Sequence, residues 1–156
     1  MQVIHVDEKT PRQALEQVVA IETASFPAHE SLGTAIVDEA KKQGHVMLLA
    51  VDVASSSVLG YVLYSRNSIA GRVVKIAVHP SKRRLGIGRT LLQQAIRLLS
   101  NCMCITLHVA VRRDGAFQLY ESLGFQVQDC RRDYYAKGHD AFFMELSKSD
   151  YSRALS

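Results

Sequence analysis

The chain has 156 residues, a length that fits one domain with its own core and leaves little room for a second. Its 19 Lys and Arg stand against 15 Asp and Glu, which gives a formal net charge of +4. This mild excess favours an anionic partner but is too small for a protein that coats nucleic acid. The longest apolar run, Val46 to Val51, is far too short to cross a bilayer.

The first elements of the chain are predicted to be a strand and a helix. Val3 to Val6 forms the strand, and Thr10 followed by Pro11 is a typical helix start, with Thr10 as the cap. The helical spacing that follows is carried by Leu15, Val18, Val19 and Glu22.

A turn, a second helix and a strand hairpin are expected next. The turn runs from Ser25 to Gly33 and leads into a helix through about Lys42. Two strands, 46–53 and 58–66, are joined by the small polar turn 54–57, which predicts an antiparallel pair.

The second half alternates strands with amphipathic helices. Strands are predicted at 72–78, 104–111, 125–130 and 141–147, with helices after Gly88 and at 115–124. The order βααβββαβαββ predicts an α/β (or α+β) fold with a mixed central sheet and helices on both faces. Residues 149–156 are interpreted as a frayed C-terminal tail.

The three cysteines, Cys102, Cys104 and Cys130, form no paired framework. Their odd number, and an N-terminus without the basic and apolar regions of a signal peptide, indicate a reducing, cytoplasmic location. No His or second Cys cluster accompanies them, so we interpret Cys102 and Cys104 as buried structural residues and expect no metal.

A basic, glycine-containing turn separates the strand ending at Val78 from the next helix. A helix start offers unpaired N–H groups and a positive dipole end, and glycine lets the backbone approach a ligand, so this turn predicts an anion site. It is no dinucleotide fingerprint, because Leu91 stands where a third glycine is needed. It is no P-loop either, because Arg89 and Thr90 follow Gly88.

Arg83, Gly86 and Gly88 match the pyrophosphate-binding pattern Arg/Gln-x-x-Gly-x-Gly/Ala of the GNAT superfamily in spacing and setting. The chain resembles these acetyl-CoA-dependent N-acetyltransferases strongly from Val74 to Leu146 and weakly before Val58. The resemblance implies a single GNAT domain over residues 1–148, with about seven strands and about four helices, and acetyl-CoA as cosubstrate. The residues that it places at the cofactor are Ile76, Ala77, Val78, Arg83, Arg84, Leu85, Gly86, Ile87, Gly88 and Arg89. A merely helix-capping or nuclear-targeting basic turn is the alternative.

The resemblance also implies the catalytic residues. The segment 119–125 is similar to the family's second cofactor-contacting segment, in which Tyr120 would protonate the departing thiolate. His108 interrupts an alternating strand where N-terminal acetyltransferases place a Glu or His base, and its ordinary pKa suits that role. A hydrogen-bonded structural histidine is the alternative. Backbone N–H groups of 76–78, where the family carries a bulge, would stabilise the oxyanion.

One position departs from the family pattern. Relatives usually have an asparagine seven residues before the helix tyrosine, where it caps the helix and contacts the pantetheine arm, but this chain has Arg113. Because arginine cannot cap a helix N-terminus, we expect Asp114 to take over the cap.

The acceptor is predicted from the last hairpin and the front turn. Residues 131–146 resemble the hairpin of enzymes that acetylate protein N-termini, which places Tyr134 and Tyr135 against a peptide backbone. The alternative is that one of them is a core residue, because neighbours on a strand point to opposite faces. Phe26 and Pro27 resemble the substrate loop of the bacterial alanine N-acetyltransferases, although a similar turn occurs in arylalkylamine enzymes.

These resemblances predict an acetyltransferase that acts on the α-amine of a protein or peptide. A small-molecule amine acetyltransferase is the second interpretation, and a non-catalytic cofactor-binding regulatory module is the third. We expect no nucleic-acid or membrane partner, because no recognition motif accompanies the basic charge. A partner subunit is left open.

Overall fold

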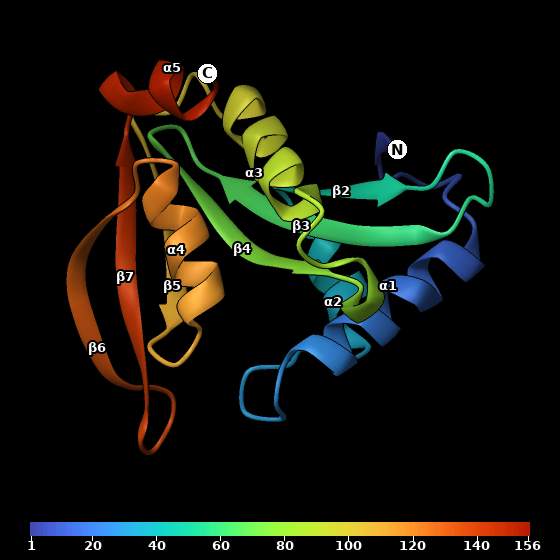
Figure 1. Cartoon of the computed structure of the whole chain (residues 1–156), viewed down its shortest axis with the longest axis horizontal. Helices are drawn as coiled ribbons and strands as arrows, with labels where there is room; N and C mark the ends of the chain where they lie inside the picture. Colours follow the sequence, from blue (N-terminus) through green and yellow to red (C-terminus); the bar gives the residue numbers. More distant parts are fainter.

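A seven-stranded mixed sheet forms the centre of the molecule in the computed structural model, which describes residues 1–156 (Figure 1). Its order is β1-β2-β3-β4-β5-β7-β6, and every neighbouring pair is antiparallel except the parallel pair β4 and β5. The strands are β1 (Gln2–His5), β2 (His45–Val51), β3 (Val58–Arg66), β4 (Ala70–Val78), β5 (Cys104–Ala110), β6 (Gln126–Ala136) and β7 (His139–Ser147). The helices are α1 (Arg12–Ser25), α2 (Ala35–Ala40), α3 (Ile87–Leu98), α4 (Asp114–Ser122) and α5 (Tyr151–Ala154). The predicted fold class and strand number are confirmed.

Two cores lie on opposite faces of the sheet because successive strand residues point to opposite sides. In β2, Met47 and Leu49 pack in the core under α1 and α2, whereas Leu48 and Ala50 pack in the larger core with α3, α4 and α5. Both faces of β2 are therefore covered, which explains its continuous apolar run. None of the five helices combines the length and the apolar character needed to cross a membrane.

The sheet opens between β4 and β5. These strands pair only from Ala70 to Val73 on β4 and from Cys104 to Leu107 on β5, and beyond these pairs they diverge, as Figure 1 shows. Next to the last pair, β4 carries a bulge against β3: Tyr64 faces Val73 and Leu63 faces Lys75, which leaves Val74 between them. A bulge bends its strand, and this bend accompanies the opening. The expected bulge exists, but it lies at Val74 and not within 76–78.

Two predictions at element ends are wrong. Thr10 does not cap α1, which has Pro11 at its N-cap; the Thr10 hydroxyl instead accepts the N–H of Asp7 at 2.9 Å. Asp114 does not cap α4 but is its first residue, and no side chain caps this helix.

The C-terminal segment is folded and not frayed. A 3-10 turn, Lys148–Asp150, leads into α5, where Tyr151 and Ala154 are buried in the larger core. The Tyr151 hydroxyl donates to the Cys102 carbonyl at 2.9 Å. Cys102 is buried as predicted, Cys104 is half-buried, and all three cysteines are free. The polar composition of this segment hid two apolar residues at helical spacing.

Candidate active site

The turn between β4 and α3 presents bare backbone to solvent. The backbone N–H groups from Arg83 to Arg89 donate no hydrogen bond within the chain. Gly86 is the N-cap of α3 at φ +80°, and Arg84 is also left-handed at φ +66°. A left-handed non-glycine residue is strained, and such strain gathers at binding sites. Unpaired N–H groups at a helix start form a seat for an anion.

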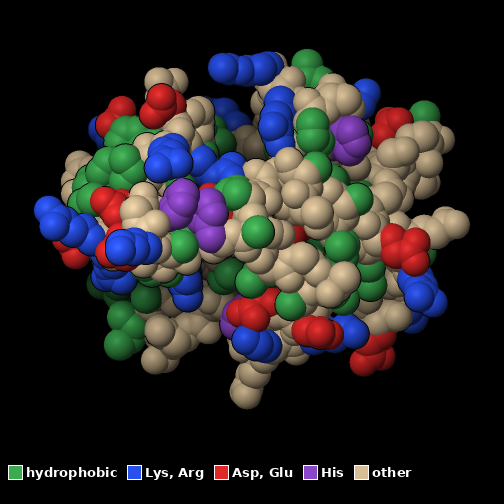
Figure 2. Space-filling view, turned by 90° about the horizontal axis from the view of Figure 1, so that it is seen from below, with side chains coloured by type: hydrophobic (Ala, Val, Ile, Leu, Met, Phe, Trp, Pro, Cys, Tyr) green, Lys and Arg blue, Asp and Glu red, His purple; other side chains and the backbone are tan.

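A cleft of about 700 Å³ lies over this turn and is closed on its other side by α4. Every residue predicted at the cofactor lines it except Leu85, which is 69% exposed. Its lining has one carboxylate, that of Asp114, and six basic side chains. The basic residues are Lys82, Arg83, Arg84, Arg89, Arg112 and Arg113. Figure 2 shows Lys and Arg side chains gathered around a hollow on this side of the molecule. The charge and free N–H groups suit the phosphates of coenzyme A. We call this the cofactor cleft.

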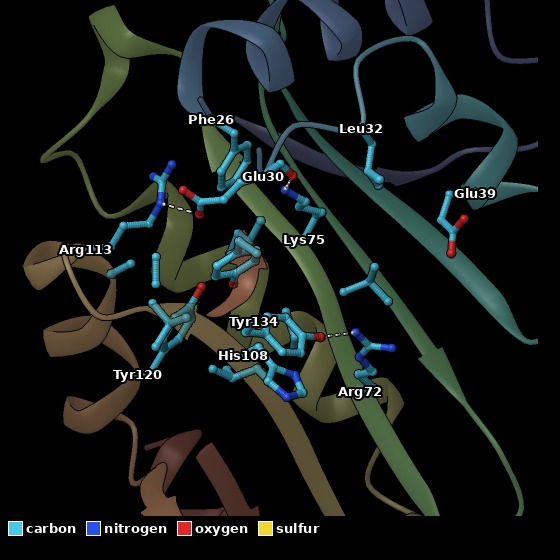
Figure 3. Close-up of a pocket in the computed structure, with 18 residues that line it drawn as sticks. Phe26, Glu30, Leu32, Glu39, Arg72, Lys75, His108, Arg113, Tyr120 and Tyr134 are labelled. Atoms are coloured by element: carbon cyan, nitrogen blue, oxygen red, sulfur yellow. Dashed lines mark hydrogen bonds and ion pairs between the residues drawn. The ribbon is translucent and has the colours of Figure 1, made fainter. Parts of the chain in front are cut away.

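A second cleft, of about 310 Å³, opens between the diverging strands β4 and β5 (Figure 3). The loop after α1 covers it from one side, and the tyrosines of β6 line the other. The two clefts share part of their lining: Phe26, Ile76, Arg113, Ala116 and Tyr120. A molecule in the cofactor cleft and one in this acceptor cleft would therefore meet at these residues.

Tyr120 lies where the clefts join. Helix α4 holds its ring in the larger core, edge-on to Phe125, and its side chain is 6% exposed. Figure 3 shows its hydroxyl directed into the acceptor cleft. Burial raises the pKa of Tyr120, and Tyr135 raises it further, while Arg113 opposes them. The hydroxyl therefore keeps its proton at neutral pH and can donate it.

His108 also lines the acceptor cleft, but its ring is engaged. Its Nε2 lies 3.0 Å from Nη1 of Arg131, which can only donate, so Nε2 is the acceptor and the imidazole is neutral. The other nitrogen, Nδ1, is buried without a partner, and the ring stacks on Tyr134 at 4.2 Å. Burial, then Arg131 and Arg72, lowers the pKa of His108 to about 4. As a base, His108 would have to release Arg131 first.

A buried carboxylate anchors the loop that covers the acceptor cleft. Glu22 is fully buried, accepts the hydroxyl of Tyr61, and accepts the backbone N–H of Leu32 at 2.8 Å. Its Oε2 also lies 3.5 Å from Nζ of Lys75, which donates to the Glu30 carbonyl at 2.6 Å. This network joins α1, the second half of the loop and strand β4.

The predicted acceptor residues divide between two places. Phe26, Tyr134 and Tyr135 line the acceptor cleft, whereas Pro27 lines a third, neighbouring cleft of about 370 Å³. Tyr134 and Tyr135 both face the acceptor cleft, edge to face at 4.9 Å, and neither belongs to a core. The expected opposite orientation fails because β6 breaks register here, with Asp133 left-handed at φ +53°.

Several polar residues of the acceptor cleft were not predicted. Glu30 is 7% exposed and lies 3.3 Å from Nε of Arg113, and the Tyr134 hydroxyl accepts from Arg72 at 3.5 Å (Figure 3). Glu22 alone carried a signal in the sequence, because a carboxylate on the apolar face of a predicted helix needs a buried partner.

Comparison with known proteins agrees with this geometry. The model of the acetyltransferase (GNAT) family matches residues 15–125. An N-alpha-acetyltransferase of Saccharolobus solfataricus is 30% identical over 145 residues, covering 83% of this chain and 85% of that protein. The [ribosomal protein bS18]-alanine N-acetyltransferase of Salmonella typhimurium is 46% identical over 76 residues, covering 46% of this chain and 51% of that protein. Apart from the Saccharolobus protein, the chain spans about half the length of the first curated relatives it matches.

The fold is also shared with an enzyme whose acceptor differs from that of the N-alpha-acetyltransferases named above. The structure titled aminoglycoside 6'-N-acetyltransferase complexed with coenzyme A superposes with a TM-score of 0.81 at 14% identity, covering 95% of this chain and 97% of that one. The fold alone therefore does not decide which amine is acetylated.

Proposed function

Because the chain belongs to the GNAT family of acetyltransferases, we propose that it transfers the acetyl group of acetyl-CoA to the α-amine of a protein or peptide N-terminus. The observation that carries this proposal is the meeting of two clefts at Tyr120, one with a basic, backbone-lined seat and the other with a tyrosine pair. The relatives named above support the choice of an α-amine. The free cysteines suit a cytoplasmic location.

Separate parts of the chain would bind the cofactor and orient its acetyl group. The N–H groups of 83–89, with Lys82 and Arg84, would hold the phosphates of acetyl-CoA, which supplies a thioester-activated acetyl group when bound. Arg83 is partly engaged already, because its Nε donates to the Val78 carbonyl at 3.2 Å. Beyond Val73, β4 has no partner in β5, which leaves its backbone groups on that side free to orient the reacting carbonyl.

Tyr120 is the proton donor of this proposal. Its raised pKa keeps it protonated, and its place at the junction of the two clefts supports a role as the acid that would protonate the leaving thiolate. His108 remains the proposed base, neutral at pH 7 and in reach once the hydrogen bond from Arg131 opens.

An α-amine needs less help from a base than a lysine amine does, because its pKa is lower. Roughly one α-amine in seven is neutral at pH 7, against roughly one lysine amine in 2,500, so a weak base suffices for an N-terminus. The engaged, low-pKa His108 fits an α-amine better than a lysine side chain.

The test is thiol release from acetyl-CoA by the purified protein with peptides of different first residues, beside arylalkylamines and aminoglycosides. Turnover with peptides that disappears when their N-terminus is blocked supports the proposal. Turnover with small amines alone would give the chain the second predicted function, and no turnover with any acceptor would favour the regulatory module.

A further inference from the structure

Arg113 stands where the family usually has an asparagine, and its side chain connects two parts of the site. It is the N-cap residue of α4, the helix that closes the cofactor cleft, yet its guanidinium reaches to the loop after α1. It lines the cofactor cleft, the acceptor cleft and the third cleft beside them. The side chain is 29% exposed, so most of its surface is in contact with the protein.

Three contacts hold the guanidinium against the end of α1 and the loop that follows it. Nη2 donates to the Ser25 carbonyl at 2.7 Å, and Nε donates to Oε1 of Glu30 at 3.3 Å. Its Cζ lies 4.3 Å from the ring centre of Phe26, on which Lys75 also lies at 3.7 Å. A planar guanidinium with several fixed donors can satisfy these partners together, which an asparagine or a lysine cannot.

The contact with Ser25 stabilises the C-terminal end of α1. Ser25 is the last residue of this helix, where carbonyl groups lack partners and the dipole end is negative, and α1 has no basic residue in its own last turn. Arg113 supplies that positive charge from a distant part of the chain. Arg83 of the cofactor turn also reaches this residue, donating to the Ser25 hydroxyl at 3.2 Å.

We propose that Arg113 is a positioning residue for the acceptor and not a cofactor contact: it holds Phe26 and Glu30 of the covering loop against the start of α4. The loop wall of the acceptor cleft is then set by the same helix that carries Tyr120. Because hydrogen bonds to Ser25 and Glu30 hold the guanidinium at the loop, we infer that Arg113 does not replace the contact that the usual asparagine makes with the pantetheine arm. The inference rests on the proposed function for the identity of the acceptor.

The test compares Arg113→Gln and Arg113→Lys with a matched control, Arg97→Gln, whose arginine is exposed on α3 and forms its side-chain hydrogen bond with Gln94. We expect Arg113→Gln to raise the KM for the peptide acceptor about tenfold, the usual effect of losing charge-assisted hydrogen bonds. The Kd of acetyl-CoA, measured by calorimetry, should stay within about twofold of the parent's, and kcat should fall less than kcat/KM. Arg113→Lys should recover part of the loss, and Arg97→Gln should change none of these quantities.

Two results would overturn the inference. An equal or larger loss of acetyl-CoA affinity in Arg113→Gln would make Arg113 a cofactor contact, and an unchanged peptide KM would remove its role. If the parent protein acetylates no peptide, the proposed function fails, but the inference is still tested by amide hydrogen exchange. Faster exchange of residues 26–34 in Arg113→Gln than in the parent and in Arg97→Gln supports it, and equal exchange contradicts it.

Discussion

The cofactor cleft and the acceptor cleft are built from different materials. The seat in the cofactor cleft consists of main-chain N–H groups over 83–89, a continuous stretch fixed by Gly86 and the start of α3. The acceptor cleft consists of side chains from the loop after α1 and from strands β4, β5 and β6, held by contacts such as Lys75 to Glu30, 45 positions apart. A site built from main-chain groups suits coenzyme A, which is the same in every reaction. A site built from side chains can differ in sequence with the acceptor that it binds.

Tyr120 lines both clefts, so its replacement should have the largest effect on catalysis. We expect Tyr120→Phe to lower kcat about a thousandfold, because general acid catalysis is lost while the ring still fills the core. Both ligands should still bind, with the Kd of acetyl-CoA unchanged. Steady-state kinetics and calorimetry measure the two effects. The control is Tyr151→Phe, which removes a hydroxyl bound to the Cys102 carbonyl, remote from the clefts. An unchanged kcat in Tyr120→Phe would exclude it as the acid.

Glu22→Gln should lower the stability of the protein without changing its affinity for acetyl-CoA. It leaves the Lys75 ammonium without its carboxylate, and breaking such a buried pair lowers the free energy of unfolding by about 3 kcal/mol. Urea unfolding measures this loss. Acetyl-CoA affinity should be kept, because the network supports only the acceptor loop. The control, Glu16→Gln, breaks an exposed pair with Arg12 on the same helix and should have little effect. A loss no larger than that of Glu16→Gln would contradict the proposed anchor.

Gly86→Val tests the backbone-built seat. Valine is strained at φ +80°, and we expect the Kd of acetyl-CoA to rise about tenfold as the turn deforms. Gly138→Val introduces the same residue at φ +79° in the turn between β6 and β7. The two variants should lose similar stability in thermal unfolding, but only Gly86→Val should lose cofactor affinity. Equal affinities would mean that the turn does not hold the cofactor.

The smallest expected effect concerns the charge of His108. With a pKa of about 4, His108 stays neutral from pH 6 to 8, so activity there should follow deprotonation of the acceptor amine. Between about pH 6.5 and 4 the unfolded chain binds a proton at this residue before the folded protein does, so its contribution to stability falls as the pH falls. Arg131→Gln should raise the pKa of His108 only part of the way back toward 6.5, because burial is the larger cause. An NMR titration measures both values, and a pKa near 6.5 in the parent would contradict the account.

The residues of the cofactor cleft follow a local sequence pattern, so most of them could be predicted from the sequence. A seat made of main chain requires glycine at fixed spacing, so the sequence pattern could point to Arg83, Gly86 and Gly88, all of which line the cleft, whereas Leu85 does not. Tyr120 could be singled out because its segment has a local sequence pattern, and it lines both clefts.

The acceptor cleft was predicted only in part, because its polar residues come together through tertiary packing. Glu30, Lys75 and Arg131 follow no local spacing, and the engagement of His108 by Arg131 depends on the register between β5, β7 and β6. The bulge in β4 was placed too late in the strand because a register shift depends on the partner strand. The folded C-terminus was missed because its two buried residues, Tyr151 and Ala154, gain their partners only from the completed core.

Amide hydrogen exchange with and without acetyl-CoA tests the difference between the clefts most directly. In the free protein the amides of 84–89 have no partner and should exchange fast. Acetyl-CoA should slow exchange at these residues, and addition of a peptide acceptor should then slow exchange in the loop 26–34. Unchanged exchange at 84–89 with acetyl-CoA bound would contradict a seat built from backbone N–H groups.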